Sequence, residues 1–303
     1  MNNGTITNNG GAYDVQNGSV GAILAGTSAT LTKSGTGTVT LSATNTYTGA
    51  TIVSSGTLIV SGTINNSTGV TVNGGTFNYT NNTTGLATNG VTVNSGGTFK
   101  YNSTQPYSGL LTLNNGGTLG GSGNMSSTAV YLVSGSTLSP GNSPGILTTG
   151  AQTWVNGGNY NWQLFDTALA AGTGYDTTTI TGSLDLSGLT AGGFNVNLWT
   201  LSSITPDTNG NALNFTNTND YSWTIATATG GINGFNPANF TISTLANNGA
   251  GGFSNTLSAG GAFSMSVSGN DLLLNYTAVP EPATWGLLAF SLTTVLVFRR
   301  RRS

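Results

Sequence analysis

The sequence GGTFNYT at residues 74–80 returns as GGTFKYN at residues 96–102. Shorter versions of the same phrase occur as GTLIVSGT at 56–63 and as GGTLGGSG at 116–123. The threonine that follows the turn in each copy can be aligned along the chain, which gives Thr38, Thr57, Thr76, Thr98, Thr118 and Thr137. Their spacings of 19, 19, 22, 20 and 19 residues indicate a stacked array with a period near twenty.

Apolar and polar residues alternate on both sides of each glycine step. Val70-Thr71-Val72 and Val91-Thr92-Val93 precede the turns, and Phe77-Asn78-Tyr79 and Phe99-Lys100-Tyr101 follow them. A period of two is typical of strands with one buried face. The paired glycines between the strands tolerate the positive φ of a tight turn. Each unit therefore predicts two or three short strands.

A coil of about twenty residues cannot bury its apolar face alone, so successive coils must stack. The sequence therefore predicts a parallel β-solenoid with layers ~4.8 Å apart. In this arrangement Val72 stacks on Val93 and Phe77 on Phe99, and Tyr79 and Tyr101 also point inward. One polar position just before the turn is expected to form an amide ladder from coil to coil. The residues at this position are Asn73, Asn94 and Asn114.

Composition supports an all-β protein. Only 5% of the 303 residues are charged, against roughly 25% in an ordinary soluble domain. The hydrophobic fraction is 36%, and Val, Ile, Thr, Phe and Tyr, which favour strands, are prominent. A disordered chain would have more charge and fewer apolar residues. The absence of cysteine fits an exported protein without disulfides.

The few charges exclude one class of partner. All four arginines lie at 299–302, and the rest of the chain before Pro280 has Lys33 and Lys100 against seven aspartates, a formal charge of −5. Nucleic-acid phosphates require clustered Lys or Arg, so no nucleic-acid partner is predicted. Lys33 and Lys100 are both expected to be single solvated charges.

The residue inventory also limits catalysis. Histidine and cysteine are absent, which excludes Ser-His-Asp and Cys-His chemistry and metal sites built from those ligands. Asp166, Asp176 and Asp185 remain as candidate carboxylates, and turn roles are the favoured interpretation for them. The sequence thus predicts no catalytic residue, no metal and no cofactor. The alternative is a β-helix polysaccharide lyase or glycoside hydrolase that uses Asp176 and Asp185.

The pattern changes after Gly150. Residues 151–278 keep strand-like segments but lose the strict period, and large aromatic residues appear. We expect this region to be a β-rich cap, because an uncapped solenoid end exposes unpaired strand edges. Trp154 and Trp162 are its best candidates for surface aromatics that could stack on sugars.

The stretch LTKSGTGTVTLSATNTYTGATIVSSGTLIV, residues 31–60, resembles the autotransporter-associated β-strand repeat. The resemblance implies a right-handed parallel β-helix, here over residues 20–150, and LSPGNSPGILTTG at 138–150 resembles a phrase that closes such helices. Autotransporters end in a membrane β-barrel, but residues 151–278 are too few for a typical barrel of that type. Residues 1–19 have no signal-peptide pattern, so we expect a truncated start or a capping segment.

The tail at 279–303 has a different composition. An uncharged apolar run of 16 residues, 283–298, follows Pro-Glu-Pro and precedes Arg299, Arg300, Arg301 and Arg302. This run predicts a short transmembrane helix with Trp285 at the interface, the arginines in the cytoplasm and the body outside. A permanent C-terminal anchor is one interpretation.

The three-part order of this tail resembles the PEP-CTERM sorting signal. Pro280, Glu281 and Pro282 match its recognition motif, and the prolines keep the segment extended. The resemblance implies cleavage by an exosortase-type membrane protease, followed by release to the cell surface or extracellular matrix in bacteria that make exopolysaccharide. The sequence therefore predicts an exported structural or adhesion protein.

Overall fold

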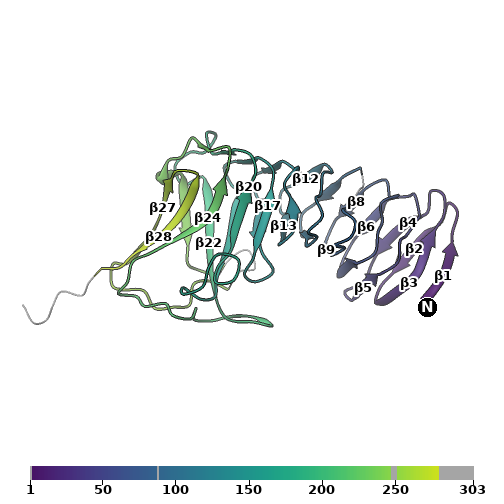
Figure 1. Ribbon diagram of the computed structural model, residues 1–303, viewed down its shortest axis with the longest axis horizontal. Helices are drawn as coiled ribbons and strands as arrows, with labels where there is room; N and C mark the ends of the chain where they lie inside the picture. Colours follow the sequence, from purple (N-terminus) through teal and green to yellow (C-terminus); the bar gives the residue numbers. More distant parts are fainter. Residues whose placement is uncertain (1, 87–88, 247–250, 280–303) are drawn as a thin grey trace, which may run out of the picture.

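The computed structural model describes residues 2–86, 89–246 and 251–279, which form an elongated parallel β-solenoid (Figure 1). The molecule is narrow at its N-terminal end and broad at the other end. Within the described residues the only helical segment is a 3₁₀ turn, Pro237–Asn239. The all-β parallel solenoid predicted from the sequence is therefore confirmed. The predicted helix at 283–298 lies outside the described residues.

One sheet runs the whole length of the solenoid and receives one strand from each coil. Its register pairs Thr57 with Thr76, Thr76 with Thr98 and Thr98 with Thr118, so the aligned threonines occupy one column. Phe77 pairs with Phe99 in the same strands. The strands, in spatial order, are β1 (Asn2–Thr7), β3 (Gly18–Ala25), β5 (Thr38–Leu41), β7 (Thr57–Val60), β9 (Gly75–Tyr79), β11 (Gly97–Tyr101), β13 (Thr118–Gly121), β16 (Thr137–Pro140), β19 (Asn159–Leu164), β22 (Phe194–Ile204) and β23 (Asp207–Asn209), with β26 (Phe240–Ser243) also paired to β22.

A second sheet covers the opposite side of the narrow part. Val72 pairs with Val93 in it, as the repeat predicts. Its parallel strands are β2 (Ala12–Val15), β4 (Thr30–Lys33), β6 (Thr51–Val53), β8 (Val70–Val72), β10 (Val91–Val93) and β12 (Leu111–Leu113).

The solenoid broadens from β13 onward because each coil gains a third strand. One of the two further sheets contains β14 (Asn124–Met125), β17 (Ile146–Thr149), β20 (Thr177–Ile180), β24 (Tyr221–Ala228), β28 (Asp271–Thr277) and β27 (Ala262–Ser268). The other contains β15 (Val130–Leu132), β18 (Gln152–Trp154), β21 (Leu184–Asp185) and β25 (Ile232–Asn233).

Parallel stacking continues past residue 150, where the sequence analysis places the end of the solenoid. Strands β16, β19, β22 and β26 pair in parallel one after another. The period disappears from the sequence because the later coils contain insertions that project from the solenoid. The antiparallel β22–β23 pair is one of these insertions. Closure is confined to the hairpin of β27 and β28, whose second strand pairs antiparallel with β24.

Ranks of aromatic side chains fill the interior. The rings of Tyr79 and Tyr101 stack at 5.7 Å, as the inward orientation predicts. Trp154 and Trp162, expected at the surface, are instead fully buried. Trp154 stacks on Phe194 at 4.5 Å. The broad coils enclose more space between three sheets, and large aromatic rings fill it.

Candidate functional site

The predicted asparagine positions form a ladder at the surface of the narrow part. Asn94 Nδ2 donates to Asn73 Oδ1 at 2.7 Å, and Asn114 Nδ2 donates to Asn94 Oδ1 at 2.7 Å. The broad part repeats the device, because Asn197 Nδ2 donates to Asn161 Oδ1 at 2.9 Å. The ladder holds coils in register and leaves few free groups on the inner members, so its role is structural.

A buried corner in residues 31–60 was not singled out by the sequence analysis. Asn45 Oδ1 accepts from the Leu24 N–H at 3.0 Å, and its Nδ2 donates to Thr63 O at 3.1 Å. This one amide joins three successive coils. Nearby, the Tyr47 hydroxyl lies 2.6 Å from Thr51 Oγ1. The side chains of Asn45 and Tyr47 are almost fully buried, so these polar residues of the repeat stabilise the fold.

Lys33 is buried rather than solvated. Its ammonium group donates to the carbonyl oxygens of Ser34, Gly35 and Ser55 at 2.6, 2.8 and 3.1 Å. Burial lowers the pKa of Lys33, and the Asp14 carboxylate partly opposes this effect. The side chain therefore fastens two turns together and is not available to a ligand.

The two candidate catalytic carboxylates are not brought together. Asp176 is fully buried, and it accepts from the backbone N–H groups of Gly145 at 2.8 Å and Gln163 at 3.1 Å. Burial raises the pKa of Asp176 well above its usual value, although these hydrogen bonds act in the opposite direction. Asp185, in β21, accepts from the hydroxyl and the N–H of Ser187 at the surface, and these bonds lower its pKa.

Asp166 also has a structural role. Its Oδ1 accepts from the Ala168 N–H at 2.8 Å and from Asn214 Nδ2 at 2.7 Å. Acceptance from the residue two positions on, seen at both Asp166 and Asp185, is the turn geometry that aspartate favours. Within the described residues no group of three acidic side chains is placed to hold a metal ion.

A polar groove of about 360 Å³ lies on the outer face of the longest sheet, where the narrow and broad parts meet. Strands β11, β13, β16, β19 and β22 pass beneath it. Its polar lining includes Lys100, Ser143, Asn161, Gln163, Trp199 and Asp207.

The polar groove forms because Gly120 has no side chain at its floor and because hydrogen bonds of Ser143 fix one wall. Gly120 pairs with Lys100 on one side and Ser139 on the other, so no side chain fills the outward position between them. The Ser143 hydroxyl builds the wall, because it contacts Gln163 Oε1 at 3.0 Å and also bonds the Asp207 carboxylate. This network ties the loop after β16 to β19 and β23.

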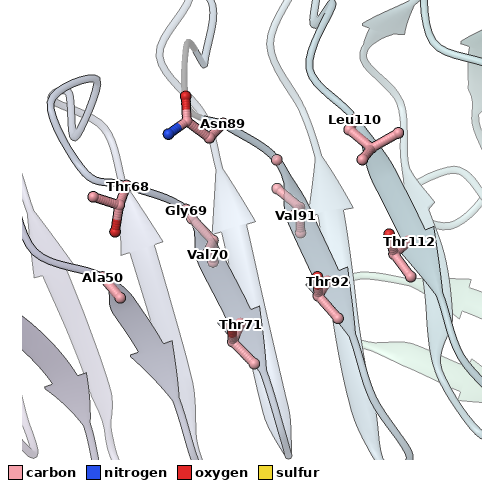
Figure 2. Close-up of a pocket in the computed structure, with 11 residues that line it drawn as sticks. Ala50, Thr68, Gly69, Val70, Thr71, Asn89, Val91, Thr92, Leu110 and Thr112 are labelled. Atoms are coloured by element: carbon pink, nitrogen blue, oxygen red, sulfur yellow. The ribbon is translucent and has the colours of Figure 1, made fainter.

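A second hollow, of about 290 Å³, lies on the opposite sheet. Figure 2 shows Thr71, Thr92 and Thr112 in a row along β8, β10 and β12, with Leu110 at the rim. No charged side chain lines this hollow. The row continues the coil-to-coil repetition, and it lacks the mixture of donors found in the polar groove.

Comparison with known proteins gives two matches. Residues 31–60 match the passenger-associated-transport repeat, and residues 278–302 match the PEP-CTERM protein-sorting motif. The chain carries a PEP-CTERM sorting signal. This signal implies export and processing by an exosortase, a membrane protease. A search of curated proteins gives no significant match.

The PEP-CTERM motif includes every predicted sorting and anchoring residue. Pro280, Glu281, Pro282, Trp285 and the arginines at 299–302 all fall within the matched range and outside the described residues. Across residues 2–86, 89–246 and 251–279, the structure contains no helix with the length and apolarity needed to cross a bilayer.

Proposed function

We propose that this protein is a non-catalytic component of the cell surface or extracellular matrix, associated with exopolysaccharide. The PEP-CTERM motif at residues 278–302 is the observation that carries the proposal. The last strand of the described residues, β28, ends at Thr277, directly before the motif. Removal of the tail therefore leaves every described strand of the solenoid in place.

The body suits a mechanical role. Its strands pair along a continuous sheet from β1 to β23, so backbone hydrogen bonds run along the long axis. With a charged fraction of only 5%, its surface contacts depend little on ion pairs that salt would screen. Exposed amides and hydroxyls offer many hydrogen-bonding groups to a hydrated glycan.

The positions of the carboxylates favour a role without catalysis. Asp176 is committed to backbone N–H groups in the interior, and Asp185 is committed to Ser187. Glycoside hydrolysis requires two carboxylates that flank one bond, about 5–10 Å apart. A lyase or hydrolase that relied on Asp176 would lose turnover in the Asp176→Asn variant, and detection of such turnover on any polysaccharide would contradict the proposal.

Before processing, we propose that residues 283–298 hold the chain in the membrane, with Arg299–Arg302 on the cytoplasmic side. The exosortase then cleaves near Pro280–Pro282 and frees the body on the outer side. The protease and the exopolysaccharide are the two partners in this scheme.

The test is the C-terminal mass of the mature protein isolated from its own envelope and medium. A chain that ends near Pro280–Pro282 and sediments with the exopolysaccharide fraction is expected. Glu281→Ala should leave the tail in place, whereas Asp220→Asn, a comparable change in the body, should not. A mature chain that still ends at Ser303 would overturn the sorting part of the proposal, and a cleaved chain that never sediments with polysaccharide would overturn the matrix part.

A further inference from the structure

We infer that the polar groove binds a carboxylate-bearing sugar residue, such as a uronic acid, within a polysaccharide chain. The inference deepens the proposed function and rests on it for the source of the ligand. It assigns a place and a chemistry to the contact, which the sorting motif does not.

The groove presents free amide donors, because the amide oxygens of Asn161 and Gln163 are already engaged. Asn161 Oδ1 accepts from Asn197, and Gln163 Oε1 lies 3.0 Å from the Ser143 hydroxyl, whose one hydrogen it shares with the Asp207 carboxylate. Their Nδ2 and Nε2 groups have no acceptor among the described residues, and they lie on the groove wall. A ligand rich in acceptor oxygens matches this pattern, and a carboxylate provides two strong acceptors on one carbon.

Lys100 adds the charge. Before Pro280 the chain has two lysines, and Lys33 is buried against three carbonyl oxygens. Lys100 is thus the single cation on the outer surface of the described body, and it forms no hydrogen bond or ion pair with another described residue. A body with a formal charge of −5 places its one accessible cation at the edge of a donor-rich groove. This arrangement selects a local negative group rather than attracting polyanions in general.

Trp199 provides an aromatic surface in the same groove. Its ring is partly exposed, and its indole N–H is the only buried side-chain polar group of the described residues without a hydrogen-bond partner. An unsatisfied donor is costly to bury, so an acceptor that reaches it after a small movement of the ring would be bound favourably. The ring face suits the apolar face of a sugar ring.

Asp207 determines the orientation of the ligand. Its carboxylate bonds Ser143 on the wall opposite the lysine strand, and it would repel a second carboxylate. The acidic group of the ligand therefore lies toward Lys100, and a sugar hydroxyl lies toward Asp207. Asp176 lies beneath the groove, where its oxygens accept from backbone N–H groups, and it does not contact the ligand.

The experiment measures binding of the tail-free body, residues 1–279, to polyglucuronate and to a neutral glucan of similar length by titration calorimetry. Wild type should bind the acidic polymer at least about tenfold more tightly than the neutral one. Lys100→Gln should remove most of this preference. Trp199→Phe, which keeps a ring but removes the N–H, should weaken binding to both polymers several-fold.

Asn9→Asp is the matched control. It also lowers the net charge by one, and its Oδ1 can still accept from the Thr27 N–H at the far end of the solenoid. Circular dichroism should show that all the variants are folded. Equal affinity for both polymers, or the same loss in Asn9→Asp as in Lys100→Gln, would overturn the inference. Cleavage of the tail and sedimentation with native exopolysaccharide test the proposed function separately, so the two can fail independently.

Discussion

The narrow coils up to Leu113 and the broad coils from Thr118 onward share one continuous sheet but differ in everything around it (Figure 1). The narrow coils have two strands each and repeat every 19 to 22 residues between Thr38 and Thr118. The broad coils have three strands each, and from Phe194 to its partner Phe240 the chain advances 46 residues. The strand that repeats in every coil therefore forms the long axis of the molecule, and the additional residues of the broad coils make it wider.

The polar groove lies where the two kinds of coil meet. Lys100 comes from the last regular coils, and Asn161, Gln163 and Trp199 come from the broad ones. A strictly repeating surface presents the same group on every layer, so it cannot gather a lysine, two amides and a tryptophan in one place. The difference between the two parts is what makes a distinctive site possible.

The largest test of this comparison is Trp162→Ala in the broad part. Trp162 is fully buried, packs against Trp223 at 5.3 Å and donates its indole N–H to Asp176 O at 2.8 Å. Loss of this side chain should reduce the free energy of unfolding by about 3–5 kcal/mol. Phe99→Leu in the narrow part should lose roughly 1 kcal/mol. Urea unfolding of both variants makes the measurement, and a loss well below about 3 kcal/mol for Trp162→Ala would show that this ring is not a main support of the broad part.

Next in size is Lys33→Met in the narrow part. The change removes the ammonium donor shared by the carbonyl oxygens of Ser34, Gly35 and Ser55, of which Gly35 O keeps a bond from the Ser55 hydroxyl, and it should destabilise the protein by about 1–3 kcal/mol. The matched control is Lys100→Met, on the outer face, which should change the free energy of unfolding by less than about 0.5 kcal/mol. If Lys100→Met reduces the free energy of unfolding as much as Lys33→Met does, the assignment of Lys33 as a link between two turns is wrong.

A pH-dependent difference is expected at Asp176 in the broad part. Because burial raises the pKa of its carboxyl group in the folded state, the folded protein holds this proton more tightly than the unfolded chain does. Stability from this group is thus fully present below the unfolded pKa near 3.8 and is lost as pH rises through the folded pKa. The loss cannot be steeper than about 1.4 kcal/mol per pH unit.

Asp176→Asn removes that ionisation. The free energy of unfolding of the variant minus that of wild type should increase as pH rises above about 4. Thermal unfolding across pH 3–8 gives the profile. Asp185→Asn is the comparison, because hydrogen bonds lower the pKa of Asp185, and its contribution to stability is lost as pH falls. A difference for Asp176→Asn that is independent of pH would refute the assignment.

The smallest effect is expected in the ladder. Asn94→Ala removes two inter-coil hydrogen bonds at the surface and should reduce the free energy of unfolding by about 1 kcal/mol. A double-mutant cycle with Asn73 isolates the shared bond. A coupling free energy near zero would mean that the narrow coils are aligned by their backbone and core alone.

The sequence was sufficient where a residue had an equivalent of the same chemical type in the next coil. Thr76, Phe77 and Tyr79 could be assigned to an outward or inward column because Thr98, Phe99 and Tyr101 repeat them. Trp154 pairs in register with the buried Leu132 of the preceding coil, but this equivalence was missed because the solenoid was expected to end at residue 150. Its burial became clear only from its contact with Phe194, forty residues later.

Lys33 could have been placed by the same rule that placed its neighbours. It lies two positions after Leu31 in β4, and both side chains point inward. Alternate residues of a strand face the same side, so the pattern already placed Lys33 inward, although its charge suggested a solvated position. The groove could not have been predicted, because Lys100, Gln163 and Asp207 come from separate coils and an insertion whose position the period does not encode.

The amide ladder has a direction. In each of its pairs, the later coil donates and the earlier coil accepts. A duplicated coil inserted between Asn73 and Asn94 would meet an acceptor on one side and a donor on the other without any change of side chain. The length of the molecule can therefore be altered in whole steps of about 4.8 Å, one coil at a time. Duplication of a single coil in the gene could therefore change the length of the molecule while the broad end stays intact.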